Sequence, residues 1–284
     1  MSFSREERME KKKILVIGGD ERQKYLAGAL KDKAFEVAYE EQVTPSVSER
    51  IKSCQILLLP IAAKEPITDV AAEYAVSGQK IYGGVFPAGF SAACEEKGVL
   101  LYDYMKDDTI AIQNAVATAE GAIAEAIVGS KRNLHNSRCL VLGFGRCGEI
   151  LADKLKGLKC DVTIMVRSEK AMAKAAAYGY HVKAFGQKIE SQKEEKKEDY
   201  HFIFNTVPAM VADRRFLEKQ SRNTLIIDLA SAPGGVDRRA CEELGITLKS
   251  CLGLPAKYAP ETSADILAKI ISRREWDEER SVGV

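Results

Sequence analysis

The stretch Cys139-Leu-Val-Leu-Gly-Phe-Gly-Arg-Cys-Gly148 lies in the middle of the 284-residue chain and decides its fold. A short apolar strand precedes Gly143, Gly145 and Gly148, which have the spacing G-x-G-x-x-G, and a helix opens at Glu149. In such a turn the first glycine makes the tight bend and the second lets the backbone approach a pyrophosphate. The third lets helix and strand pack closely. The helix N-terminus attracts the anion. An ordinary turn without a nucleotide can share these glycines, but the order of strand, glycines, helix and second strand favours a dinucleotide site. Its predicted residues are Gly143, Phe144, Gly145, Arg146, Cys147 and Gly148.

The end of the next strand indicates which dinucleotide is bound. Apolar residues fill Asp161–Val166, and Arg167 and Ser168 follow directly. An acidic residue at this place binds the ribose 2′-hydroxyl and selects NAD, whereas arginine and serine can pair with a 2′-phosphate. We therefore expect NADP(H), with a solvated strand-end charge as the alternative for Arg167.

Strands alternate with helices along two stretches of the chain, which predicts two doubly wound parallel sheets. Predicted strands of the first stretch lie at 13–17, 36–39, 55–60, 80–85 and 99–102, and those of the second at 138–142, 161–166, 201–205, 224–229 and 246–250. A long helix over 108–128 separates the two stretches. We expect an N-terminal substrate-side α/β domain (1–108), then the interdomain helix with a Rossmann domain (109–258). A C-terminal helix (259–284) is expected to pack back on the first domain.

Three further strand ends carry small or polar residues. Parallel strands place their carboxyl ends at one edge of the sheet, where ligands of such folds bind. Each of the three segments can also be an ordinary turn that uses Gly, Pro and Ser for backbone reasons. The predicted cofactor-binding residues at these ends are Asn205, Thr206, Val207, Pro208, Leu229, Ala230 and Gly253.

Composition excludes several classes of protein. The 42 basic and 41 acidic residues nearly balance, so no general charge favours nucleic acid or an acidic membrane. The seven cysteines are scattered without a C-x-x-C pair, which favours reduced thiols in the cytoplasm and no metal site. No apolar run is long enough to span a membrane.

Together, several motifs resemble the A-subunit family of dipicolinate synthases from spore-forming bacteria over nearly the whole chain. The glycine fingerprint is the least specific of them, whereas the helix motif and the last segment are much more so. The matching segments are Gly18-Gly-Asp-Glu-Arg22, Asn114-Ala-Val-Ala-Thr-Ala-Glu-Gly121, Gly143–Gly148, Asn205–Pro208, Asp228-Leu-Ala-Ser-Ala-Pro-Gly-Gly235 and Gly253-Leu-Pro-Ala-Lys-Tyr-Ala-Pro260. The layout is also similar to that of D-2-hydroxyacid dehydrogenases, adenosylhomocysteinase and alanine dehydrogenase.

The resemblance implies an NADP-dependent oxidoreductase that aromatises a dihydrodipicolinate-type ring to pyridine-2,6-dicarboxylate during sporulation. It also implies a flavoprotein-like B-subunit as partner and a place in the mother-cell cytoplasm. Two-domain dehydrogenases often pair, so by analogy we expect a homo-oligomer, with a dimer as the simplest form.

Aromatisation removes one hydride and one proton from a substrate with two carboxylates, so a base and cations are required. The predicted catalytic residues are Glu120, Asp228 and Lys257, and the predicted substrate-binding residues are Arg22, Asn114 and Thr118. Asn114 and Thr118 are four apart and share a helix face. Glu120 is the candidate base, with a helix-surface carboxylate as the alternative. Lys257 and Arg22 are candidate partners of the substrate carboxylates, and for Arg22 a helix-surface charge is the alternative. Asp228 can instead orient the backbone.

Two other functions stay open. One is another two-domain NAD(P)-dependent dehydrogenase of a small carboxylate. D-2-hydroxyacid dehydrogenases use a histidine late in the cofactor domain, whereas the three histidines here are His135, His181 and His201, which disfavours that form. The other is a nucleotide-binding, non-catalytic subunit, which a turnover assay of the chain alone would distinguish.

Overall fold

The computed structural model describes residues 11–33, 35–186 and 199–282. The chain divides into two compact units. Unit 1 contains the described residues up to Gln113 and those from Ala259 on, and unit 2 contains Asn114–Tyr258. The long helix α5 (Asp108–Gly129) begins in unit 1 and continues into unit 2.

The described part of unit 1 is a five-stranded parallel sheet in the order β2-β1-β3-β4-β5. Its strands are β1 (Lys13–Ile17), β2 (Glu36–Glu40), β3 (Ile56–Leu58), β4 (Lys80–Gly83) and β5 (Leu100–Asp103). Its helices are α1 (Glu21–Lys31), α2 (Val47–Ser53), α3 (Ile67–Tyr74), α4 (Ala88–Glu96), the 3₁₀ turn η1 (Tyr104–Lys106) and α11 (Pro260–Val282).

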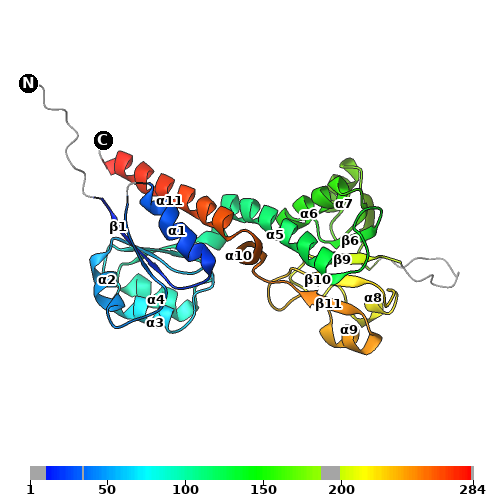
Figure 1. Ribbon diagram of the computed structural model, residues 1–284, viewed down its shortest axis with the longest axis horizontal. Coiled ribbons are helices and arrows are strands. Elements are labelled where there is room, and N and C mark those ends of the chain that lie inside the picture. Colours follow the sequence, from blue (N-terminus) through cyan, green and yellow to red (C-terminus); the bar gives the residue numbers. More distant parts are fainter. Residues whose placement is uncertain (1–10, 34, 187–198, 283–284) are drawn as a thin grey trace, which may run out of the picture. The chain divides into compact units, whose positions relative to one another are not determined.

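The alternation of side chains along β1 explains why helices cover both faces of this sheet. Ile14 and Val16 pack in the core beneath α1 and α11, whereas Leu15 and Ile17 pack in the core beneath α2, α3 and α4. Both faces of the sheet can be followed in Figure 1. A parallel strand that is buried on both faces needs a continuous apolar run, and Ile14–Ile17 supplies it.

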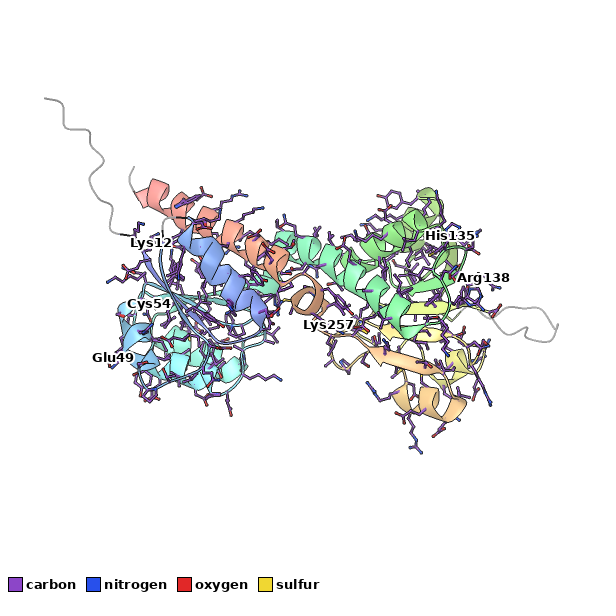
Figure 2. The ribbon with its side chains drawn as sticks, viewed as in Figure 1. Lys12, Glu49, Cys54, His135, Arg138 and Lys257 are labelled. Atoms are coloured by element: carbon purple, nitrogen blue, oxygen red, sulfur yellow. The ribbon has the colours of Figure 1, made fainter. Side chains whose placement is uncertain are left out.

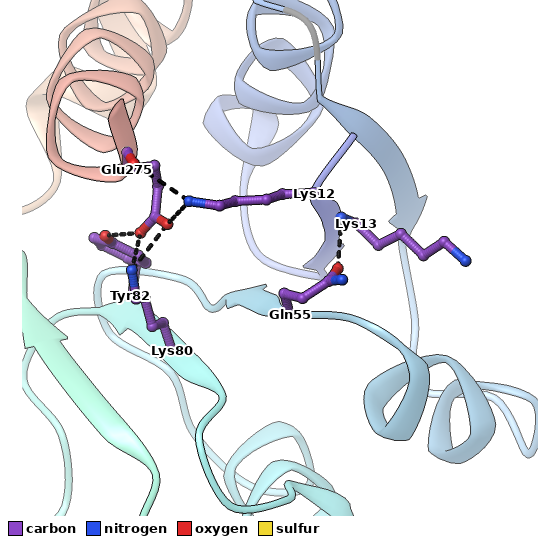
Figure 3. A network of polar contacts seen from close by, with 6 residues as sticks. All are labelled: Lys12, Lys13, Gln55, Lys80, Tyr82 and Glu275. Carbon is purple, nitrogen blue, oxygen red and sulfur yellow. Dashed lines mark hydrogen bonds and ion pairs between the residues drawn. The ribbon is translucent and has the colours of Figure 1, made fainter. Parts of the chain in front are cut away.

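A buried carboxylate ties α11 to the sheet. Glu275 on α11 is 1% exposed, and its side chain accepts hydrogen bonds from Lys12 at 3.0 Å, from Lys80 at 2.9 Å and from the Tyr82 hydroxyl at 2.7 Å (Figure 3). Burial by itself raises the pKa of Glu275, but the hydrogen bonds from Tyr82, Lys80 and Lys12 outweigh it and lower that pKa below its ordinary value. The carboxylate therefore stays ionised and joins the C-terminal helix to β4.

The described part of unit 2 is a six-stranded parallel sheet in the order β11-β10-β9-β6-β7-β8. Its strands are β6 (Arg138–Leu142), β7 (Asp161–Val166), β8 (His181–Ala184), β9 (Phe202–Asn205), β10 (Leu225–Asp228) and β11 (Thr247–Ser250). Its helices are α6 (Arg146–Gly157), α7 (Glu169–Ala177), α8 (Arg214–Leu217), α9 (Arg238–Leu244) and α10 (Leu254–Tyr258), together with most of α5.

The strand order reverses direction between β6 and β9, which makes their carboxyl ends the switch point where ligands of doubly wound sheets bind. Residues of α5, α6 and α7 share one core with the sheet, and residues of α8 and α9 share the core on the opposite face (Figure 1). The predicted fold class, two doubly wound parallel sheets of which the second is of the Rossmann type, is confirmed.

One edge of this sheet was not among the predicted strands. β8 has the sequence His-Val-Lys-Ala, which is short and lacks an apolar run. An edge strand such as β8 has a neighbouring strand on one side only, so it needs no continuous apolar run. The helix α8, of four residues, is too short to show helical periodicity.

Candidate dinucleotide site

The turn between β6 and α6 has the geometry that a pyrophosphate requires. Gly143 has φ +96°, a conformation that favours glycine, and a Cβ there would lie 2.5 Å from Thr206 Oγ1. A Cβ on Gly148 would collide with the carbonyl oxygen of Gly143, so the third glycine lets the helix sit against the turn. Apart from Gly145 itself and its two chain neighbours, no described atom lies within 4 Å of a Cβ built on Gly145. The space at the second glycine is therefore open to a ligand.

The N-terminus of α6 lies at that open space. Gly145 is its N-cap residue and, as a glycine, has no side chain that could accept from the first N–H groups of the helix. The first N–H groups of a helix have no partner within the helix and carry its positive dipole end. Open space and uncapped N–H groups fit a bound pyrophosphate.

Asn205 and Asp228 form a buried network at the ends of β9 and β10. The parallel register pairs the two residues directly. The Asn205 side-chain amide donates to Asp228 Oδ1 at 2.8 Å and to the Val207 carbonyl at 3.1 Å. Asp228 also accepts from the backbone N–H groups of Ala230 at 3.2 Å and Gly235 at 3.4 Å. Both oxygens of the Asp228 carboxylate therefore accept hydrogen bonds from backbone N–H groups, and these bonds orient the loop after β10.

Thr206 fixes the glycine turn from the neighbouring strand. Its hydroxyl donates to the Leu142 carbonyl at 2.9 Å, next to Gly143. The backbone N–H of Leu229 donates to the Asn205 carbonyl at 2.9 Å. The predicted segments at Asn205–Pro208 and Asp228–Ala230 thus lie together at one edge of the sheet.

A cavity of about 1080 Å³ opens at this edge beside the glycine turn. Of the predicted cofactor residues, Gly143, Phe144, Gly145, Arg167, Ser168 and Val207 line it. Its apolar lining includes Met165, Val166, Ala171, Val211 and Phe216. Ligand pockets are commonly about 300–1,000 Å³ in volume and mostly apolar with a few polar groups, so the cavity is of a size to take much of a dinucleotide.

Arg167 and Ser168 lie at the end of β7 as predicted from the chain order. Arg167 is exposed and has no hydrogen-bond or ion-pair partner within the described residues. The Ser168 hydroxyl oxygen accepts from the Ala171 N–H at 3.2 Å and so caps α7. Its own proton stays available as a donor toward the cavity.

Three predicted residues lie on α5 in unit 2. The Asn114 side-chain oxygen is enclosed and has no hydrogen-bond partner in the described part of the chain. Thr118 donates its hydroxyl to the Asn114 carbonyl at 3.0 Å, one turn back along the helix. Glu120 is exposed and pairs with Lys154 of α6 at 2.8 Å. An enclosed acceptor without a donor is costly, so Asn114 has an unmet hydrogen-bonding capacity.

Lys257 lies on α10 (Figure 2), where it meets a carboxylate that the sequence analysis missed. Glu125 of α5 accepts hydrogen bonds from Lys257 at 2.5 Å, the Tyr258 hydroxyl at 2.8 Å and Lys249 at 3.0 Å. The hydrogen bonds from Lys257, Tyr258 and Lys249 outweigh burial and lower the pKa of Glu125 to about 2. The Lys257 side chain is nevertheless 62% exposed, so its ammonium group can also reach a ligand.

Arg22 lies in unit 1, beside the turn that follows β1. Its guanidinium donates to Asp20 with Nε at 2.8 Å from Oδ1 and with a second nitrogen at 2.5 Å from Oδ2. Asp20 also caps α1 by accepting from the Arg22 N–H at 3.1 Å. Burial raises the pKa of Asp20, but the hydrogen bonds and charge of Arg22 outweigh it and lower that pKa. A substrate carboxylate would have to share Arg22 with Asp20.

The remaining predicted cofactor residues do not line the cavity: Arg146, Cys147, Gly148, Asn205, Thr206, Pro208, Leu229, Ala230 and Gly253. Gly148, Asn205 and Thr206 instead shape the turn and the loops around it. The cavity has three lining cations that the sequence analysis did not single out, namely Lys183, Arg215 and Lys219. The missed Glu125 did carry a signal, because it lies three residues after Ala122 on the buried stripe of α5.

Within the described ranges, no group of three or more His, Cys, Asp or Glu side chains is placed to hold a metal ion. A search of the same residues finds no helix with the length and apolar character needed to cross a membrane.

The sequence and the structure of this chain were compared with those of known proteins. No family model matches the chain. It is 29% identical to the A-subunit of dipicolinate synthase from Bacillus subtilis (strain 168) over 270 residues, which cover 92% of this chain and 86% of that protein. The crystal structure of the dipicolinate synthase A chain from Bacillus subtilis matches with a TM-score of 0.82 at 26% identity and covers 96% of this chain and 98% of its own.

A more distant match shows how widely the fold is shared. The structure of D-lactate dehydrogenase from Escherichia coli matches with a TM-score of 0.64 at 13% identity, covering 93% of this chain and 97% of that one. The predicted resemblance is confirmed: this chain is similar to the dipicolinate synthase A-subunit in sequence and in structure over most of its length, and it shares its fold with D-lactate dehydrogenase.

Proposed function

We propose that this chain is an NADP-dependent oxidoreductase that oxidises a dihydrodipicolinate-type ring to dipicolinate. The observation that carries the proposal is the open, uncapped turn at Gly145 beside a cationic cavity, in a chain homologous over 92% of its length to the dipicolinate synthase A-subunit. The turn supports dinucleotide binding, and the homology supports the substrate.

The residues present fit the cofactor. The N–H groups at the start of α6 would hold the pyrophosphate, and Arg167 with Ser168 would hold the 2′-phosphate. Asn205, Thr206 and Asp228 keep the surrounding loops in place through their hydrogen bonds. When bound, NADP⁺ supplies the acceptor for the hydride that leaves the ring.

Aromatisation also releases a proton, for which Glu120 is the proposed base. Its carboxylate is exposed and its ion-pair partner, Lys154, is a surface cation, so it is accessible to a substrate. Lys257 is the proposed cation for a substrate carboxylate, and Arg22 of unit 1 is a second candidate for that role. Asn114 and Thr118 are the proposed polar contacts on α5. Asp228 is proposed to act by orienting the loop after β10, because both of its oxygens accept from N–H groups.

The homologue is named as one subunit of a synthase, which supports a partner for this chain. We propose a flavoprotein-like B-subunit as that partner, self-association into a homo-oligomer, and activity in the mother-cell cytoplasm during sporulation.

The test is an assay of turnover of a dihydrodipicolinate-type substrate, in which the formation of NADPH is measured. The assay is run with the purified chain alone and with its partner present. Turnover by the chain alone supports the proposal. Turnover in neither condition, with NADP(H) still bound, would leave the chain a nucleotide-binding protein without chemistry of its own.

The role of Glu120 has its own test. Glu120→Gln should lower kcat by about a hundredfold or more if it is the base, without weakening NADPH binding. Glu149→Gln is the matched control, because Glu149 of α6 likewise makes an ion pair with a lysine of a neighbouring helix, Lys174 of α7, at 2.6 Å. Near-wild-type turnover of Glu120→Gln would remove it from the mechanism.

A further inference from the structure

Two adjacent arginines on the short helix α8 have opposite surroundings. Arg214 pairs with Glu218 at 3.2 Å and with Glu243 at 2.5 Å. Arg215 lines the dinucleotide cavity and has no ion-pair or hydrogen-bond partner within residues 11–33, 35–186 and 199–282. The chain therefore neutralises one arginine of the pair and leaves the charge of the other facing the cavity.

The described lining of the cavity has more cationic than anionic side chains. Among the described residues it contains four cationic side chains and one carboxylate, namely Arg167, Lys183, Arg215 and Lys219 against Asp213. The Asp213 carboxylate accepts from the Phe216 N–H at 2.9 Å and so caps α8. These cations come from three places in the fold: the end of β7, the edge strand β8 and the segment at α8.

This charge exceeds what the glycine turn needs. The turn meets the pyrophosphate with backbone N–H groups, which carry no formal charge. A phosphate monoester adds a charge of about −1.5 to −2 and three acceptor oxygens. A guanidinium presents five N–H donors in a planar fork that matches such oxygens. The second open arginine therefore matches a second anionic group.

We propose that Arg215 contacts the 2′-phosphate of NADP(H) together with Arg167, and so sets the preference of this chain for NADP(H) over NAD(H). The inference rests on the proposed function, and deepens it by assigning specificity to a residue outside the strand-end position where it is usually sought. Arg215 is a specificity residue of the cofactor site and has no part in the proton transfer.

The test is a fluorescence titration of the full chain with NADPH and with NADH, on the wild type, Arg215→Ala and Arg214→Ala. Arg215→Ala should raise the Kd for NADPH by about tenfold to a hundredfold, the size of a lost charge-assisted contact, and leave the Kd for NADH within about threefold. Arg214→Ala should change neither Kd, because Arg214 does not line the cavity. Arg215→Lys should recover part of the NADPH affinity.

A double variant shows whether both arginines serve one phosphate. If they do, the effects of Arg167→Ala and Arg215→Ala on NADPH affinity are non-additive, because the two side chains share a partner. Additive effects would place them on separate groups and overturn the shared contact.

The remaining outcomes separate the inference from the function on which it rests. A wild type that binds neither nucleotide would overturn both. A wild type that prefers NADPH, with Arg215→Ala unaffected or weakened equally for both nucleotides, would overturn the role of Arg215 alone. The melting temperature of each variant shows whether it is folded. We expect every variant to fold, because Arg167, Arg214 and Arg215 are all exposed.

Discussion

In each unit the first strand leads through a glycine turn into a helix, β1 into α1 in unit 1 and β6 into α6 in unit 2. The space in these two turns is filled differently. In unit 1, Gly19 has φ +92° and a Cβ there would meet the Gln23 side chain at 2.9 Å and Pro60 at 3.0 Å. Asp20 places a carboxylate on the N-terminus of α1. In unit 2, a Cβ on Gly145 would meet no described atom beyond its chain neighbours, and the N-cap residue of α6 is this glycine, which has no capping side chain. Unit 1 thus satisfies its helix dipole with its own anion, whereas unit 2 leaves the dipole for a ligand.

A second comparison concerns two carboxylates, one in each unit, each bound by two lysines and a tyrosine. Glu275 is 1% exposed and its lysines, Lys12 and Lys80, have side chains that are 25% and 15% exposed. Around Glu125 the enclosure is looser, because Lys257 is 62% exposed. A carboxylate bound by two lysines and a tyrosine therefore stabilises the fold in unit 1. In unit 2 the same kind of cluster also holds the ammonium group of Lys257 at a position that solvent reaches.

The largest effect is expected from Glu275→Gln, which leaves two lysines beside a neutral amide. Breaking a buried ion pair in this way costs about 3–5 kcal/mol, so unit 1 should unfold at lower denaturant concentration. Glu125→Gln is the matched variant in unit 2 and should cost less, because water reaches Lys257. Denaturant unfolding followed by circular dichroism measures both. Equal losses would contradict the difference in enclosure.

Gly145→Ala tests the open turn. The added methyl group meets no described atom and the backbone at φ −95° accepts alanine, so the melting temperature should stay unchanged. The methyl group occupies the approach of the pyrophosphate, and dinucleotide affinity should fall about a hundredfold, which is about 2.7 kcal/mol. Gly28→Ala on α1 is the control, because there too an added methyl group meets no described atom beyond the adjacent backbone. Unchanged binding in Gly145→Ala would mean that the ligand does not approach this turn.

The pH dependence of stability follows from the lowered pKa of Glu125. In the unfolded chain the pKa of this carboxyl is near 4.5, and in the folded chain it is about 2. A lowered folded-state pKa contributes stability that is fully present above the unfolded value and is lost as the pH falls toward the folded one. The free energy of unfolding should therefore decrease between about pH 5 and pH 2. In Glu125→Gln this decrease should be smaller, and an identical pH profile in the two proteins would contradict the assignment.

The smallest effect is expected from Asp20→Ala in unit 1. Loss of an N-cap side chain costs about 1 kcal/mol, measured as a shift in thermal unfolding. The variant should still lack a second dinucleotide site, because Gln23 and Pro60 continue to fill the turn. A gain of nucleotide stoichiometry in Asp20→Ala would show that the carboxylate alone closes that turn.

The sequence was sufficient for the fold because its strong signals are local. The runs of apolar residues at 138–142 and 161–166 coincide with β6 and β7. The glycines with G-x-G-x-x-G spacing lie in the turn between β6 and α6 and in the first part of α6. The long helix predicted at 108–128 corresponds to α5. The edge strand β8 and the helix α8 lack such signals, since one is half exposed and the other spans four residues.

The site was harder to predict because its parts meet only in the folded chain. Neighbouring strands bring Asn205 beside Asp228, and the proximity of these strand ends could be expected from the parallel order. The contacts of Glu125 with Lys249 and Lys257 depend on how α5 packs against α10, which no local pattern encodes. Arg215 differs from Arg214 only in the direction of its side chain, and the sequence Arg-Arg contains no information about that direction.

The central claim is that the turn of unit 2, and not that of unit 1, binds a dinucleotide with a 2′-phosphate. Isothermal titration calorimetry of the full chain with NADPH and with NADH tests it most directly. We expect one NADPH per chain, bound at least about tenfold more tightly than NADH. Two sites per chain, equal affinity for both nucleotides, or no binding of either would contradict it.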